Sequence, residues 1–456
     1  MKSIFKIPLL LLLVHVAQAQ TEPAAGLKMY SLQQCIDYAR DNNPNLKNAR
    51  AALQSSQARV GEIVATGLPQ ISASGNLTDN YQIPTSFLPA QIFDPNAPAG
   101  EFIGVQFGTK YTGAASLNLD QMIFNGSYFV GLKASRTYTE LARKDLVKSE
   151  TDVVEAIKKA YYSVLVNKER VDLVNRNLQR IDSLLRQTRI QFENGFVEKI
   201  DVNRIQVQYN NLVNAQKNAA LGLTMSYNLL KFQMGLPIQE MIGLSDSLET
   251  INSAVLDESF RTGFQYTNRI EYNQLEVNRA LVELDIRNVK SQYLPTIDFF
   301  ANYGASYGTS TANDFLQFGA NWRSLGSFGL RANVPIFDGL RKSKVIQQKK
   351  SQLSQIDNTL DLTRRQIDME QEQATLSFNN NIETLRMQRQ NMDLSREVYD
   401  VAVIKYQQGV GSNLEVIDAD AAYKEAQTNY FAALYDTLIA SVDLEKAYGK
   451  LIPVSK

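Results

Sequence analysis

Few residues of this sequence are of types that do chemistry. Among 456 residues there is one histidine, His15, and one cysteine, Cys35. Glu415 and Asp418 stand three residues apart, so on a helix their carboxylates would share one face. Paired carboxylates can hydrolyse glycosidic bonds, which leaves an exported hydrolase as one alternative. Because a helix face gives such a pair no concave pocket, we predict no catalytic residue, no metal site and no cofactor.

The start of the chain predicts export. Residues 1–19 have a basic beginning, an apolar run and an Ala-Gln-Ala ending, which is typical of a signal sequence cleaved after Ala19. The alternative, a membrane anchor, needs about 20 apolar residues, and this run is shorter. His15 would leave with the signal. Cys35 has no partner for a disulfide within the chain, and we expect it to pack in a helix.

The charge balance and the low proline content further restrict the class of protein. Lys+Arg and Asp+Glu both number 47, so no excess charge draws the chain to nucleic acid, and we predict no such partner. Only 12 prolines occur, and no Pro/Gly/Ser-rich linker divides the sequence. This composition favours one extended architecture.

The sequence contains an internal repeat. A segment predicted to be helical ends before Leu68-Pro69, and another ends before Leu294-Pro295. Each is followed by a stretch in which apolar and polar residues alternate. The residue before a proline avoids the helical conformation, so both helices should stop there. Later, Ile-Phe-Asn-Gly at 123–126 corresponds to Ile-Phe-Asp-Gly at 336–339, and Asn or Asp can cap the long helix that follows.

Four stretches alternate apolar with polar or small residues, which predicts β-strands. We expect them at about 70–79, 112–124, 296–305 and 327–337, with Phe300 breaking the pattern. One such strand could belong to a β-sandwich with a solvated face, but four in an exported chain favour a membrane barrel. Since the smallest single-chain barrels have about 8 strands, the chain must oligomerise, and three copies would supply about 12.

Two glycines interrupt very long helices. No proline occurs between 126 and 191, and the apolar residues follow a coiled-coil rhythm over roughly 100 Å of helix. A coiled-coil stalk is one interpretation, and a water-filled tube is another. Glycine tolerates the left-handed conformation that ends a helix, so Gly195 and Gly409 are predicted to form hairpin tips.

Together these motifs resemble the TolC family of outer-membrane efflux proteins, over about residues 30 to 450. The resemblance implies a mainly α fold with a membrane β-barrel: a homotrimer with four strands per chain in a 12-stranded barrel, and long antiparallel coiled-coil helices forming an α-barrel in the periplasm. It also implies the outer membrane as location and outer-membrane lipid as surroundings. A periplasmic adaptor and an inner-membrane transporter of the RND, ABC or MFS class would be the partners.

The resemblance also assigns site residues. Glu415 and Asp418 match acidic rings at the periplasmic entrance, while Tyr406 and Asp201 match residues that hold it shut. The family's arginine in this closing contact corresponds to Gly411, so its ion pair should be missing here. The expected adaptor contacts lie at the two tips: Gly195, Phe196, Val197, Gly409, Val410 and Gly411.

The predicted organisation is a signal peptide at 1–19, a first repeat at 20–227, a connector at 228–257, a second repeat at 258–450 and a tail at 451–456. Within the repeats, the long helices should end near 193 and 407, with tips at 194–198 and 408–412. The predicted function is a trimeric channel that passively conducts substrates in a tripartite efflux or type I secretion system. The alternative is an exported coiled-coil stalk without channel activity.

Overall fold

A computed structural model describes residues 28–248, 263–315 and 322–452. The predicted signal peptide at 1–19 lies outside the described residues, as do parts of the predicted connector and tail. The chain divides into two compact units, one formed by residues 1–38 and 160–256 and the other by 39–159 and 257–456. The units therefore cut across the repeats, and helix α3 (Gly126–Glu193) contributes to both.

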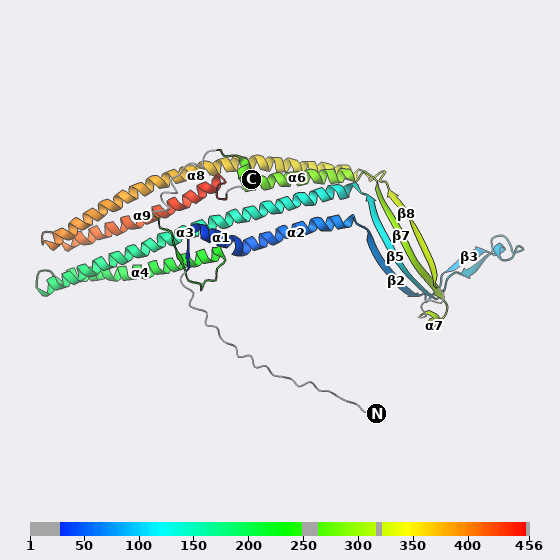
Figure 1. The fold of residues 1–456 in the computed structure, drawn as a ribbon, viewed down its shortest axis with the longest axis horizontal. Helices are drawn as coiled ribbons and strands as arrows, with labels where there is room; N and C mark the ends of the chain where they lie inside the picture. Colours follow the sequence, from blue (N-terminus) through cyan, green and yellow to red (C-terminus); the bar gives the residue numbers. More distant parts are fainter. Residues whose placement is uncertain (1–27, 249–262, 316–321, 453–456) are drawn as a thin grey trace, which may run out of the picture. The chain divides into compact units, whose positions relative to one another are not determined.

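The first unit combines a two-stranded parallel sheet with one short helix and two long helical segments (Figure 1). Strand β1 (Lys28–Tyr30) pairs in parallel with β6 (Ile242–Leu244), and α1 (Leu32–Asn42) follows β1. The distal part of α3 turns at Gly195 into α4 (Lys199–Met234), which returns beside it. A hydrogen bond of 2.7 Å from Gln216 to Asn175 links these two helices.

Asp246 holds the core of this unit together. Its Oδ2 accepts hydrogen bonds from the Tyr161 hydroxyl at 2.8 Å and from the Leu32 amide at 3.0 Å. Burial, followed by the contact with Asp246, raises the pKa of Tyr161. Cys35 is fully buried in α1, which confirms the packed helical position predicted for it, and burial raises the pKa of its thiol to about 12.

The second unit contains a four-stranded antiparallel sheet in the order β2-β5-β7-β8. Its strands are β2 (Gln70–Asp79), β5 (Tyr111–Phe124), β7 (Thr296–Thr309) and β8 (Arg323–Asn333). All four lie where alternation predicts strands, although their ends differ. Strand β8 stops before the predicted end at 337 because Pro335 has no amide for the ladder.

The register separates the two faces of the sheet. Directly paired residues form one apolar row that crosses all four strands, namely Ile71, Leu119, Ala301 and Phe328. The adjacent row, on the opposite face, is polar and consists of Ser72, Asn118, Asn302 and Ser327. The apolar face is open: Ile71 is 75% exposed and Phe328 80%.

Phe300 departs from this alternation for a local reason. It lies on the polar face opposite Gly329, where its ring fills the space that a side chain at 329 would need. The guanidinium of Arg331 stands 5.2 Å from the centre of the same ring. The aromatic ring therefore covers a glycine in the sheet and pairs with a cation.

Helices extend from one end of the sheet (Figure 1). They are α2 (Pro44–Thr66), the first part of α3, α6 (Ile270–Ser291) and α8 (Arg341–Gln407). Helix α9 (Asn413–Ala447) follows the turn at Gly409, returns beside α8 and ends before it reaches the sheet. As predicted, α2 and α6 end just before Pro69 and Pro295. The predicted caps are also present, since Asn125 accepts from the Ser127 amide at 2.9 Å and Asp338 from the Lys342 amide at 3.0 Å.

Short elements complete the described chain. They are β3 (Thr85–Pro89), the 3-10 turn η1 (Ala90–Ile92), β4 (Phe102–Gln106), the 3-10 turn η3 (Tyr266–Asn268) and α7 (Ala312–Phe315). Within the described ranges, no helix combines the length and the apolar character that crossing a membrane requires.

Candidate functional site

Both interruptions of the long helices are left-handed glycine caps. Helix α3 ends before Gly195, with φ +78°, and α8 ends before Gly409, with φ +73°. At each tip the residue after the glycine donates its amide to the carbonyl five residues back, Phe196 at 2.9 Å and Val410 at 3.1 Å. The conformation predicted for these glycines is therefore confirmed, and the bonds satisfy carbonyls that the helix ends leave free.

Each return helix begins with its own cap. Ser412 Oγ accepts from the Glu415 amide at 3.2 Å, and this fixes the first turn of α9. At the other tip, Glu198 and Asp201 form a capping box, in which the Asp201 carboxylate accepts from the Glu198 amide at 3.3 Å. Asp201 also lies 3.8 Å from Arg204, so part of its hydrogen-bonding capacity is used within its own helix.

A groove between α8 and α9 lies beside the second tip. Charged and apolar side chains line it together, among them Glu397, Val398, Val401, Lys405, Glu415 and Asp418. Glu415 and Asp418 are both exposed, and they stand one turn apart at the start of α9, where the helix dipole favours negative charge. The acidic side chains outnumber the one lysine among these six residues, so the groove carries net negative charge.

Close backbone packing explains the glycine at 411. Its amide donates to the Lys405 carbonyl at 3.1 Å, and a Cβ at this position would stand 2.9 Å from the Lys405 Cβ. A larger residue would force the tip loop away from α8. Glycine at 411 thus allows the tip loop to pack closely against Lys405 of α8.

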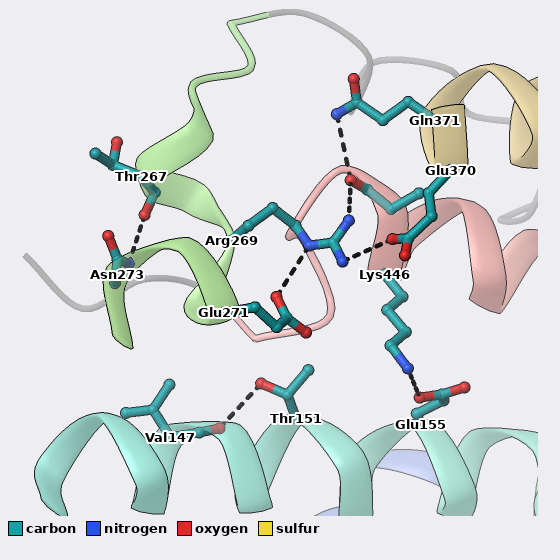
Figure 2. A network of polar contacts seen from close by, with 11 residues as sticks. Val147, Thr151, Glu155, Thr267, Arg269, Glu271, Asn273, Glu370, Gln371 and Lys446 are labelled. Atoms are coloured by element: carbon teal, nitrogen blue, oxygen red, sulfur yellow. Dashed lines mark hydrogen bonds and ion pairs between the residues drawn. The ribbon is translucent and has the colours of Figure 1, made fainter. Parts of the chain in front are cut away.

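A second set of polar contacts, shown in Figure 2, centres on Arg269, whose side chain is only 6% exposed. Its guanidinium donates to Glu271 at 3.2 Å, to Glu370 at 2.8 Å and to the Ala447 carbonyl at 3.2 Å. It thereby joins the start of α6 to the middle of α8 and the end of α9. Sequence reasoning missed this residue because its partners lie 101 and 178 positions away.

Close to these contacts, charged side chains of α3 form ion pairs with α9. The Glu155 carboxylate lies 2.7 Å from Lys446 and 2.8 Å from Lys159, and Lys159 also lies 2.6 Å from Asp443. Burial alone would raise the pKa of Glu155, but hydrogen bonds from the two lysines outweigh burial and lower it. These pairs tie α3 to the carboxyl end of α9.

No group of His, Cys, Asp and Glu able to hold a metal ion occurs among the residues that the structure describes.

The comparison that decides the family is a match to the model of the outer membrane efflux proteins over residues 35–236 and 268–450. This chain belongs to the outer membrane efflux protein family.

Relatives and solved structures agree with that assignment. The outer membrane protein TolC of Vibrio cholerae is 20% identical over 446 residues, covering 97% of this chain and 95% of the relative. The cobalt-zinc-cadmium resistance protein CzcC of Cupriavidus metallidurans is 22% identical, covering 74% and 77%. The solved structure of CusC aligns with a TM-score of 0.72 at 15% identity over 94% of this chain and 95% of that one.

This outer membrane efflux protein is accordingly an outer-membrane protein with a helical part in the periplasm. The structure of VceC from Vibrio cholerae, with a TM-score of 0.67 at 15% identity over 92% of this chain and 96% of that one, shares the fold. The TolC resemblance inferred from the repeated motifs is confirmed.

The predicted site residues fall in both units. Glu415, Asp418 and Tyr406 belong to the second unit, where Tyr406 is buried on α8, while Asp201 belongs to the first. A contact between Tyr406 and Asp201 stays a prediction. At the tips, Phe196 is 81% exposed, Val410 is 79% exposed and Val197 is half-buried.

Proposed function

We propose that this outer membrane efflux protein works as a homotrimeric channel. Within the described chain, the sheet order leaves β2 and β8 as edge strands, each paired on one side only. Edge strands of this length invite pairing with another chain, and closure removes them. Because the four strands alternate in direction, β8 of one copy would pair antiparallel with β2 of the next, and three copies would make about 12 strands.

The observation that carries this proposal is the open apolar face of the sheet. Its rows align across all four strands, and side chains such as Phe328 and Leu330 stay largely exposed. Water makes such a face costly, while lipid accommodates it. The opposite face offers hydroxyls and amides, for example the 2.9 Å contact between Ser74 and Ser116, to a water-filled lumen. A coiled-coil stalk would have no need of either face.

The periplasmic entrance is proposed to lie at the hairpin tips. Threefold symmetry would arrange Glu415 and Asp418 as two stacked rings of three carboxylates each. Such rings favour cations and oppose anions. Closure would rest on Tyr406 and Asp201, without the arginine that Gly411 replaces. The exposed Phe196 and Val410, with Val197 and the tip glycines, would offer the adaptor an apolar contact.

Transport through this channel is proposed to be passive. A periplasmic adaptor and an inner-membrane transporter of the RND, ABC or MFS class would deliver the substrate and supply the energy. Relatives are named for cobalt-zinc-cadmium resistance and for toluene efflux, so we infer that the pump selects the cargo. Glu415 and Asp418 are exposed at the groove between α8 and α9, and their proposed role is conduction, not catalysis.

The two repeats, 20–227 and 258–450, are proposed to supply equivalent halves to each subunit. Each supplies two strands of the four-stranded sheet, one long helix, one glycine tip and one return helix. The connector at 228–257 would then lie between the halves.

Ion selectivity tests the entrance. In planar bilayers under a salt gradient, wild type should show a reversal potential that reports cation preference, and Glu415→Gln/Asp418→Asn should reduce it strongly. Glu372→Gln removes the charge of an exposed acid on α8 far along the helix from the tip and should leave the potential unchanged. Equal potentials in wild type and the double variant would refute the assignment of the two rings.

A further inference from the structure

The chain between β2 and β5 forms a hairpin whose apolar side chains lie open. Strands β3 and β4 pair antiparallel, and Figure 1 shows them beyond the end of the sheet that is opposite the helices. Large apolar side chains are exposed along it, namely Tyr81, Phe87, Ile92, Phe93, Phe102 and Phe107. We name residues 81–109 the outer hairpin.

Two phenylalanines share one face of the outer hairpin. Phe87 pairs with Gly104, and Pro89, two residues further, pairs with Phe102, so both rings lie on the same side as diagonal neighbours. They are 71% and 59% exposed. On the other side Leu88 is half-buried, as is Val105. Ile103, also on that side, is 41% exposed, less than either ring, so the aromatic face carries the more exposed apolar side chains.

The outer hairpin leaves the sheet at its edge. Its neck is closed by Asn80, whose amide donates to the Lys110 carbonyl at 2.7 Å and whose side chain donates to the Thr109 carbonyl at 3.0 Å. Asn80 directly follows β2, the edge strand that trimer closure would pair with β8 of the next copy. The hairpin thus starts at the seam between neighbouring copies.

The charged residues of the outer hairpin indicate whether lipid headgroups or the neighbouring copy cover its aromatic face. Between residues 81 and 109 the only charged side chains are Asp94 and Glu101, both acidic. With no lysine or arginine, the hairpin has no cation to bind the phosphates of outer-leaflet lipid. A two-stranded hairpin is also marginally stable by itself, so it needs an apolar partner. The neighbouring copy at the seam supplies one.

We propose that the outer hairpin is an intersubunit clasp, in which the Phe87 and Phe102 face packs against the neighbouring copy at the outer end of the barrel. This inference rests on the proposed trimer. It adds a contact outside the membrane to the strand pairing within it, and the two contacts would hold the same seam.

Site-specific photo-cross-linking tests the clasp. A benzophenone amino acid replaces Phe102, or replaces Ser86 on the opposite face as a matched control, and intact outer membranes are irradiated. Position 102 should give a product with the mass of two chains, whose attachment site mass spectrometry locates at the outer end of the neighbouring copy. Position 86 should give little of it.

A second variant reports on the energetics. Phe87→Ser/Phe102→Ser should lower the temperature at which detergent-extracted trimers dissociate on a gel, while Ser86→Ala should not. Cross-links from position 102 to lipid or to another protein, or none while native mass spectrometry shows an intact trimer, would overturn the clasp and leave the channel standing. A monomeric wild type would overturn the clasp and the proposed trimer together.

Discussion

Replacing Arg269 with alanine should destabilise the second unit markedly. The substitution removes three hydrogen bonds from a side chain that is only 6% exposed. All three hydrogen bonds involve the charged guanidinium, and a hydrogen bond to a charged group contributes about 1.5–3 kcal/mol. Glu271 and Glu370 are 35% and 52% exposed, so water partly replaces the lost cation. The expected net loss is about 2–4 kcal/mol.

Arg279→Ala provides a matched control on the same helix. Arg279 contacts Asp357 at 2.7 Å and Glu283 at 2.8 Å. Because Arg279 is 40% exposed, against 6% for Arg269, its replacement should cost less stability. Unfolding of detergent-solubilised protein is followed by circular dichroism in increasing guanidinium chloride. Arg269→Ala should shift the midpoint clearly below wild type and Arg269→Lys should shift it less. Equal midpoints for Arg269→Ala and Arg279→Ala would show that the buried contacts of Arg269 add no more stability than the more exposed contacts of Arg279.

Three further predictions concern the thiol and the tips. The thiol pKa of Cys35 is raised from 9.0 to about 12, so the stability it contributes is present below pH 9.0 and lost as pH rises toward 12. Cys35→Ala should lack this extra pH dependence, and parallel unfolding curves over that range would contradict it. Gly409→Ala places a side chain at φ +73° and should lower the free energy of unfolding by about 1–2 kcal/mol. As a control, Gly61→Ala lies in open space on α2 and should raise the free energy of unfolding by about 0.5–1 kcal/mol in the same unfolding assay. Gly411→Ala crowds Lys405 and should speed proteolytic cleavage at the second tip; an unchanged cleavage rate would argue against the tight tip.

Local chemistry made much of the fold predictable. Strand positions followed from alternation, helix ends from Pro69 and Pro295, and tips from Gly195 and Gly409, because each depends on neighbours within a few residues. The end of β8 was placed too late, since the apolar alternation continues to Ile336 although Pro335 cannot pair. Here the missing amide outweighed the pattern.

Long-range contacts escaped the sequence. Nothing in the sequence near Arg269 indicates that it will donate a hydrogen bond to the Ala447 carbonyl. The hydrogen bonds of Asp246 with Tyr161 and Leu32 likewise join residues that are far apart in the sequence. The acids at 415 and 418 were located by the family pattern, and the structure adds that they share a groove with Lys405. Such juxtapositions depend on how the helices pack, which periodicity alone leaves open.

Single-channel recording tests the central claim most directly. Purified, folded wild-type protein is added to a planar bilayer after native mass spectrometry of the same sample. For a trimeric channel we expect a mass of three chains and discrete, cation-selective conductance steps. A folded trimer that never opens a pore, or a folded monomer, would contradict it and favour a coiled-coil interaction protein.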